Sequence, residues 1–310
     1  MLALVQKLIV FVALMLVGYV GARRGPFTPD FAKAASKLTL NVFMSATILN
    51  SVISNPPEMS GGELAYSMLV AFLVLLLSYA AAAVIARLLP IRKDRAPLFE
   101  LLTGVMNPMF IGIPVVKVLL GDQGDVGVFY IALSSVFFNL LIYTYGVWRL
   151  KSGDRNAMRL KDVISVPLIV TALSVVIFAF RIEVPELLRS LIDSMSPATM
   201  PMSMVVIGAS LGRVSLIDAF REKSLFLVSA LRLLLIPFLT WLMFLVLPAD
   251  PLLRISMLVM SACPSGIIVS ILAIQYGKDA EYCSKGILLD TALSMLTIPF
   301  LAWLLMGFSL

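Results

Sequence analysis

Ten stretches of about 20 mostly apolar residues follow one another along this chain of 310 residues, and they limit its possible folds more than any other feature. A helix needs about 20 such residues to cross the hydrocarbon core of a bilayer. We expect spans at 3–22, 31–54, 64–89, 97–119, 126–149, 162–180, 186–212, 223–247, 252–276 and 282–307. The spans at 31–54 and 186–212 are the least apolar, so we expect them to face protein or water.

The composition agrees with a membrane protein. Hydrophobic residues make up 60% of the chain and charged residues 14%, whereas about half of a soluble domain is apolar. The first apolar stretch is too long for a typical signal peptide and is followed by Arg23 and Arg24 rather than by a cleavage site, so it is expected to stay as a helix. The sequence predicts an all-α, multi-pass protein of the cell (inner) membrane.

The distribution of Lys and Arg predicts the orientation, because cytoplasmic loops carry an excess of these residues. Of the 24 Lys and Arg residues, 18 fall at 23–37, 87–95, 149–161, 213–223 and 278–285, which share one side if both termini lie outside. Five fall on the other side, and Arg232 lies within a span. The net charge of +6 then reflects membrane topology rather than nucleic-acid binding.

Several classes of enzyme are excluded by what the sequence lacks. The chain has no histidine, which rules out an HExxH metal site and a Ser–His pair. It also has no acidic cluster for magnesium and no phosphate-binding loop. Cys263 and Cys283 lack metal-ligand spacing and are expected to be small apolar fillers. We therefore expect no enzyme, no metal, no cofactor and no direct use of ATP.

The two halves of the chain are related by an offset of 156 residues. Pro29 then falls on Pro185, Asn107-Pro108 on Cys263-Pro264, and Gly121 on Gly277. A repeat with five spans must insert the second copy upside down, which is the plan of many secondary transporters. We expect a first repeat at 1–150, a cytoplasmic linker at 151–161 and a second, inverted repeat at 162–310.

The fourth and ninth predicted spans contain helix-breaking residues at matching places. Pro108 and Pro114 each remove a backbone donor in the fourth span, with Gly112 between them, and the ninth span carries Cys263-Pro264-Ser265-Gly266. Freed backbone groups are tolerated at membrane depth only beside protein, ions or water. Matching interruptions in an inverted repeat indicate a transport site. The alternative is a pair of packing kinks.

These segments carry a family resemblance. Met106 to Pro114, with its asparagine-to-proline pattern, resembles the crossover segment of the auxin efflux carrier family, which includes the plant PIN carriers and bacterial relatives. Met200 to Leu211, Ala273 to Gly277 and Thr291 to Pro299 resemble its seventh, ninth and tenth helices, so the likeness covers nearly the whole chain. The short loop between the halves points to a prokaryotic member.

The resemblance implies ten helices in two inverted five-helix repeats with broken, crossing helices four and nine, a fold similar to bile-acid symporters and sodium/proton antiporters. It also implies efflux of a small organic anion, such as a carboxylate, by alternating access at that crossing. The chain departs from the family pattern at Ser45, where proline is usual, and at Asp290, where a small or apolar residue is expected.

The candidate site residues come from these segments. The substrate-binding candidates are Asn107, Pro108, Gly112, Pro114, Cys263, Pro264, Ser265, Gly266, Ser45, Pro201 and Ser203. Asp290, with Thr291, is the candidate for a proton or a coupling ion, because a carboxylate at membrane mid-depth is usually paired or functional. The alternative is a structural pair of Asp290 with Lys285 or Arg232. Arg232 and Lys117 are the cationic candidates for an anion.

Three other functions are weighed against an organic-anion carrier. They are a cation/proton antiporter, a sodium-coupled symporter on the same fold, and a membrane receptor that transports nothing. The expected partners are the anion, a proton or sodium ion, the lipid bilayer and a second copy of the chain as a homodimer, and nucleic acid is not among them.

Overall fold

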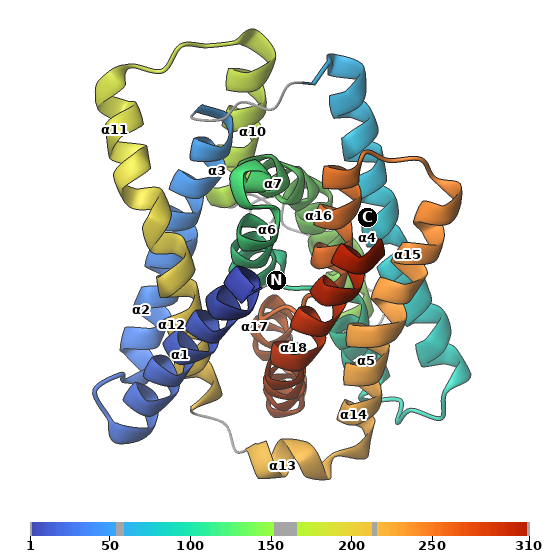
Figure 1. The fold of residues 1–310 in the computed structure, drawn as a ribbon. Helices are drawn as coiled ribbons and strands as arrows, with labels where there is room; N and C mark the ends of the chain where they lie inside the picture. The colour runs from blue at the N-terminus through green and yellow to red at the C-terminus, as the bar shows by residue number, and fades with distance from the viewer. Residues whose placement is uncertain (1, 54–58, 152–165, 213–215, 309–310) are drawn as a thin grey trace.

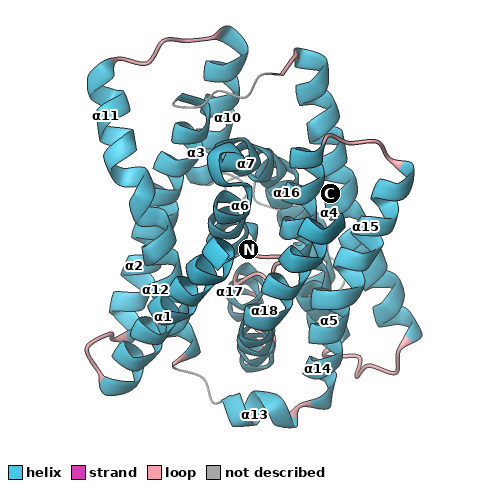
Figure 2. Ribbon diagram, viewed as in Figure 1, coloured by secondary structure: helices cyan, strands magenta, loops and turns pink. Residues whose placement is uncertain are grey.

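The computed structural model describes residues 2–53, 59–151, 166–212 and 216–308, and within them it contains helices and loops but no strand (Figure 2). The first half holds the helices α1 (Leu2–Arg24), α2 (Pro29–Leu38), α3 (Met44–Ile53), α4 (Gly61–Leu88), α5 (Ala96–Gly104), α6 (Ile113–Leu120), α7 (Gly124–Leu141) and α8 (Val147–Leu150). The second holds α10 (Val166–Phe180), α11 (Glu186–Met195), α12 (Thr199–Leu211), α13 (Leu216–Arg221), α14 (Lys223–Ala230), α15 (Ile236–Val246), α16 (Pro251–Ala262), α17 (Ile268–Gln275) and α18 (Ala280–Phe308).

The prediction of an all-α protein is confirmed, and within the described residues four helical stretches are long and apolar enough to cross a membrane. They are Gly61–Leu88, Pro108–Leu150, Lys223–Val246 and Ala280–Leu301. Val166–Phe180 and Pro251–Ala262 are shorter apolar helices. The predicted spans 97–119 and 252–276 are each divided between two helices. Apart from Lys151, the predicted linker at 151–161 lies outside the described residues.

Short irregular turns interrupt the two least apolar of the predicted spans. The π-helical turn η1 (Thr39–Phe43) separates α2 from α3, and the 3₁₀ turn η6 (Ser196–Ala198) separates α11 from α12. Pro197 provides a local cause in the second case, because proline lacks the amide that an α-helix needs. These two spans are therefore less regular than continuous helices.

The helices form two groups with a third set between them (Figure 1). On one side α1 packs against α12, and α3 packs against α10 and α11; on the other, α4 packs against α5 and α15. Between the groups lie α6, α7, α16, α17 and α18. The central set is therefore in contact with both sides, since α7 touches α3 and α4.

Glycines hold α1 and α12 close together. A Cβ atom on Gly18 would lie 2.0 Å from the carbonyl oxygen of Val205, and one on Gly208 would lie 1.9 Å from that of Met15. Small residues allow helix backbones to approach in membranes, where van der Waals packing drives association. The α1–α12 contact therefore leaves no room for a side chain at either glycine.

At one end of the molecule, charged side chains link several of the loops that connect the helices. Arg95, just before α5, forms ion pairs with Glu222 (3.2 Å) and Asp279 (3.3 Å), which precede α14 and α18. The Lys151 ammonium, just after α8, lies 5.1 Å from the ring centroid of Tyr276 at the end of α17. The connections before α5, α14 and α18 and the end of α8 therefore lie at the same end.

The connection between α15 and α16 lies at the opposite end of the molecule (Figure 1). Hydrogen bonds link it there to α4 and α7. The Tyr130 hydroxyl of α7 donates to Asp250, at 3.2 Å, and the Tyr66 hydroxyl of α4 donates to the carbonyl of Pro248. Asp250 also caps α16 by accepting from the amides of Leu252 and Leu253. The starts of α4, α7 and α16 therefore lie at this end.

Candidate functional site: two helix breaks in contact

The breaks in the two proline-containing segments touch each other. Helix α5 ends at Gly104 and α16 ends at Ala262, and the chains after them pair as one antiparallel bridge, Met106 with Ser265. The Asn107 amide donates to the carbonyl of Pro264 (2.9 Å), and the Gly266 amide donates to that of Val105 (2.9 Å). Each break thus provides hydrogen-bond partners for backbone groups that the other has freed. We call residues 105–107 and 263–267 the crossover.

The last carbonyls of α5, which have no partner within the helix, are bound by side chains from three directions. The carbonyl of Leu102 accepts from the Ser265 hydroxyl (2.6 Å), that of Thr103 from Arg232 (3.2 Å), and that of Gly104 from the Ser78 hydroxyl (2.8 Å). The terminal carbonyls of α5 are therefore satisfied although they lie inside the protein.

Arg232 donates hydrogen bonds to the ends of both helices that stop at the crossover, α5 and α16. Its side chain is fully buried, and it donates to the carbonyls of Cys263 (2.9 Å), Thr103 and Ser261 and to the Ser78 hydroxyl (3.0 Å). A cation is favourable at helix C-termini, where the carbonyl ends carry partial negative charge. Because these acceptors occupy its guanidinium, Arg232 is here a structural ligand of the crossover. The prediction that it receives an anionic substrate has no support in this geometry.

Asp290 of α18 contacts the crossover at Ser265. Its carboxyl group is fully buried and contacts the hydroxyls of Ser229 and Ser265. Arg232 acts on it electrostatically, and Lys285 forms an ion pair with Glu281 (2.6 Å). Asp290 is therefore joined to the second break by Ser265.

The predicted residues around the first break have distinct places. The Asn107 side-chain oxygen accepts from the Phe110 amide (3.4 Å) and caps the π-helical turn η2 (Pro108–Gly112), while its amide nitrogen donates to no described residue. A Cβ atom on Gly112 would lie 3.2 Å from the sulfur of Cys263, and one on Gly266 would lie 2.8 Å from the carbonyl oxygen of Met106. Both glycines therefore allow the two breaks to approach.

The other predicted candidates lie on α3 and α12. Ser45 and Ser203 are buried, and their hydroxyls have no hydrogen-bond partner among the described residues. Pro201 lies on the first turn of α12, half-buried. Helix α12 contacts η2, the turn that follows the first break. Unpartnered buried hydroxyls are costly, so Ser45 and Ser203 are two groups available to a ligand.

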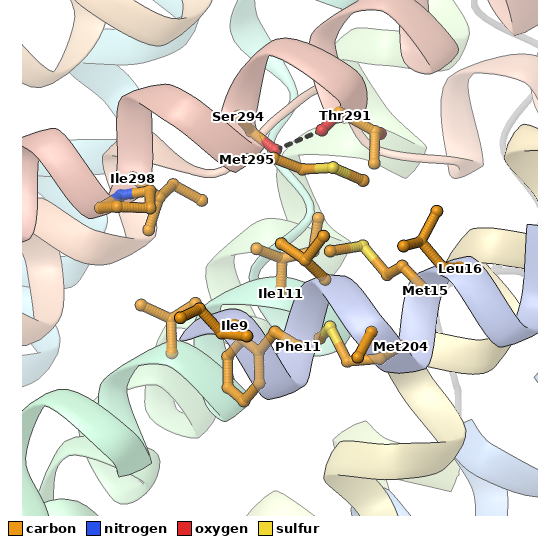
Figure 3. Close-up of a pocket in the computed structure, with 14 residues that line it drawn as sticks. Ile9, Phe11, Met15, Leu16, Ile111, Met204, Thr291, Ser294, Met295 and Ile298 are labelled. Carbon is orange, nitrogen blue, oxygen red and sulfur yellow. Dashed lines mark hydrogen bonds between the residues drawn. The ribbon is translucent and has the colours of Figure 1, made fainter. Parts of the chain in front are cut away.

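An apolar cavity of about 390 Å³ lies beside the crossover, between α1, α6, α12 and α18 (Figure 3). Ile111, Met15 and Met204 point into it, and its polar lining comes from Thr291 and Ser294. The Thr291 hydroxyl donates to the carbonyl of Ile287 (2.6 Å) and that of Ser294 donates to the carbonyl of Thr291 (2.7 Å). This space suits an apolar group.

A second cavity, of about 460 Å³, is more polar and lies between α1, α3, α6 and α12. Thr47, Thr199 and Ser196 form a hydrogen-bonded cluster in its wall, with the two threonine hydroxyls 2.7 Å apart. Pro114 and Lys117 of α6 also line it, and the Lys117 ammonium lies 2.8 Å from a carboxylate oxygen of Asp125. Of the substrate-binding candidates, Pro114 lines this cavity.

Some residues that build the site were not predicted. The hydroxyls of Ser78 and Ser229, and the backbone carbonyls of Thr103 and Ser261, become important only because distant helices meet at the crossover. Each serine is a single hydroxyl in an apolar stretch, which is common in membrane helices and carries no spacing signal. Arg232 was visible as a charge inside a span, and that charge was the one available signal.

A family model described as "Membrane transport protein" matches residues 3–161 and 155–302. This chain belongs to the membrane transport protein family. The predicted resemblance to auxin efflux carriers is thereby confirmed, and the family's description agrees with a protein that is not an enzyme.

Two archaeal relatives are similar over nearly their whole length. An uncharacterized transporter of Methanocaldococcus jannaschii is 24% identical over 304 residues, covering 96% of this chain and 98% of the relative. An uncharacterized transporter of Methanothermobacter thermautotrophicus is 24% identical over 289 residues, covering 92% and 93%. Both agree with a prokaryotic, multi-pass membrane transporter.

Proposed function

We propose that this protein is a secondary efflux carrier of a small organic anion, most simply a carboxylate, which works by alternating access at the crossover. The observation that carries the proposal is the pair of hydrogen bonds between the two breaks, from Asn107 to Pro264 and from Gly266 to Val105. Interrupted helices that meet at mid-depth are the usual place of substrate sites in transporters built from inverted repeats.

The backbone supports the inverted repeat of ten spans on which this proposal depends. Four described residues have positive φ: Gly25 (102°), Gly121 (58°), Arg181 (49°) and Gly277 (62°). The offset of 156 residues found in the sequence places Gly25 on Arg181 and Gly121 on Gly277. Positive φ is uncommon outside glycine, so its occurrence in matched pairs favours two copies of one fold, at 1–150 and 162–310.

Helix pairing supports the same repeat. The offset places α1 on α10 and α12 on α3, and the structure packs α1 against α12 and α10 against α3. The ion pairs of Arg95 and the cation–π contact of Lys151 bring together connections between helices. The ten-span topology assigns these connections to the cytoplasmic side. They agree with a cell-membrane protein whose termini both lie outside.

The substrate space that we propose consists of the two cavities, which are both lined by residues of α1, α6 and α12. The polar cavity offers the hydroxyls around Thr47 and the ammonium of Lys117, which is 39% exposed as a side chain and can interact with an anion. The apolar cavity takes the hydrocarbon part. Asn107 lies at the crossover, and its side-chain amide nitrogen donates to no described residue. A carboxylate with an apolar body suits these surroundings.

The proposal is tested by counterflow in proteoliposomes with a panel of labelled carboxylates, at two pH values, with and without sodium. Exchange of at least one carboxylate, reduced strongly by Lys117→Met, is expected. A matched control is Lys278→Met, on the connection between α17 and α18. A protein that is well folded and exchanges none of the panel would contradict the proposal.

A cation/proton antiporter or sodium-coupled symporter is the second candidate, and the buried Asp290 favours it. On this reading the ion is itself the cargo or is required for every cycle. Cation flux in the absence of any carboxylate would identify an antiporter, and exchange that stops without sodium would identify a symporter.

A further inference from the structure

Two serine hydroxyls contact the carboxyl group of Asp290. If Asp290 is ionised, these hydroxyls have too few protons for all the acceptors that they contact. The Ser265 hydroxyl lies 2.6 Å from the carbonyl oxygen of Leu102 and also contacts one oxygen of Asp290. The Ser229 hydroxyl lies 3.1 Å from the carbonyl oxygen of Leu225 and also contacts the other. Each hydroxyl has one proton to donate and faces two acceptors.

A proton on Asp290 removes this conflict at Ser265. The carboxyl group then donates to the Ser265 oxygen, and Ser265 donates to Leu102, so that both contacts are hydrogen bonds. The second carboxyl oxygen remains an acceptor for Ser229, and the Ser265 amide also faces the carboxyl group. With an ionised Asp290, by contrast, the Ser265 hydroxyl can donate to only one of its two acceptors, so either the Leu102 carbonyl loses its donor or the Ser265 oxygen faces a carboxylate oxygen with no proton between them, which is costly.

The oxygen ligands around Asp290 favour a proton over a metal cation. Among the described groups, Arg232 acts on Asp290 electrostatically, Tyr79 and Cys263 lie near Arg232, and Lys285 pairs with Glu281. The charge of Arg232 opposes a proton and a sodium ion alike, but a sodium ion would also need several oxygen ligands. A bound proton needs only the acceptor that Ser265 provides.

We propose that Asp290 is the proton-binding site of this carrier and that its proton holds the crossover together. Ser265 belongs to the second break and pairs with Met106 in the first. Movement of the breaks during transport changes the contact between Asp290 and Ser265, so binding and release of the proton are coupled to that movement. This inference rests on the proposed carrier function and names its coupling ion.

The direct test compares Asp290→Asn with the control Glu281→Gln, whose side chain is exposed at the start of the same helix. The probe is the labelled carboxylate that the wild type exchanges in counterflow. An asparagine amide can donate to Ser265 as the protonated acid does, so Asp290→Asn should lose accumulation driven by a pH gradient, and the exchange that it catalyses should no longer depend on pH. Glu281→Gln should retain the accumulation and the pH dependence. Persistent pH-driven accumulation in Asp290→Asn would overturn the proposal.

A second variant, Ser265→Ala, should shift the pH midpoint of exchange in opposite directions for a protonated and for an ionised Asp290. Ser265→Ala removes the acceptor of the Asp290 proton and should move the pH midpoint of exchange to lower pH by about one unit. If Ser265 instead donates to an ionised Asp290, the same change moves the midpoint to higher pH, and the proposal is wrong. This test does not depend on the folding of Asp290→Asn.

An infrared measurement separates this inference from the proposed function. Wild-type protein should show a protonated carboxyl band that disappears in Asp290→Asn and remains in Glu281→Gln. Absence of that band at acid and neutral pH would refute the proton site even if carboxylates are exchanged. A wild type that shows the band but exchanges no carboxylate would contradict the carrier function alone.

Discussion

Replacing Arg232 by methionine should destabilise the protein more than any comparable change at a surface arginine. Methionine keeps much of the volume of the side chain and removes its charge and donors. Three backbone carbonyls, those of Thr103, Ser261 and Cys263, then lose their donor inside the protein, and the Ser78 hydroxyl loses one as well.

The magnitude follows from these contacts. A buried polar group left unsatisfied costs about 1–3 kcal/mol, so three carbonyls cost roughly 3–9 kcal/mol. Removal of the charge also recovers part of the several kcal/mol needed to bury a guanidinium, which opposes the loss. Breaking a buried ionic contact typically destabilises by about 3–5 kcal/mol, and we expect Arg232→Met to fall in that range. For domains of 150–250 residues, this corresponds to roughly 6–20 °C in melting temperature.

The assay is thermal unfolding of purified protein in detergent. Arg254→Met is the matched control, because Arg254 is exposed and makes one described hydrogen bond, 3.2 Å long, to the carbonyl of Ala249. An Arg232→Met protein that melts at the temperature of the Arg254→Met protein would refute the reasoning.

Three further predictions concern the site, the scaffold and the topology. Asn107→Ala should reduce carboxylate exchange at least tenfold while the protein still folds, because the cap of η2 and a free donor at the crossover are both lost; unchanged flux would remove this residue from the site. Gly208→Ala should destabilise the protein by about 1–3 kcal/mol or more, because the new methyl group meets the Met15 carbonyl; Gly61→Ala, with open space around it, is the control in the same melting assay. A C-terminal tag should react with an impermeant reagent in intact cells, and reaction only after permeabilisation would invert the topology.

The sequence was sufficient for the features that lipid imposes on each segment separately. Because a bilayer requires long apolar helices with satisfied backbones, apolar runs predicted where helices occur, and prolines such as Pro108 and Pro264 predicted where they break. The family resemblance could likewise be recognised from the sequence, since it depends on short local patterns. The irregular turns η1 and η6 were not predicted. Only η6 has a local proline to explain it.

The partners of the freed backbone groups were decided by tertiary structure alone. No spacing rule links Arg232 to Thr103, or Ser265 to Asp290, because these contacts form between helices far apart in the chain. Arg232 was interpreted as a receptor for an anion because its charge was visible and its acceptors were not. The positions of helices and breaks follow from the composition and periodicity of each segment. The hydrogen-bond partners of the freed groups depend instead on which helices pack together, and these partners are determined only when the two breaks meet.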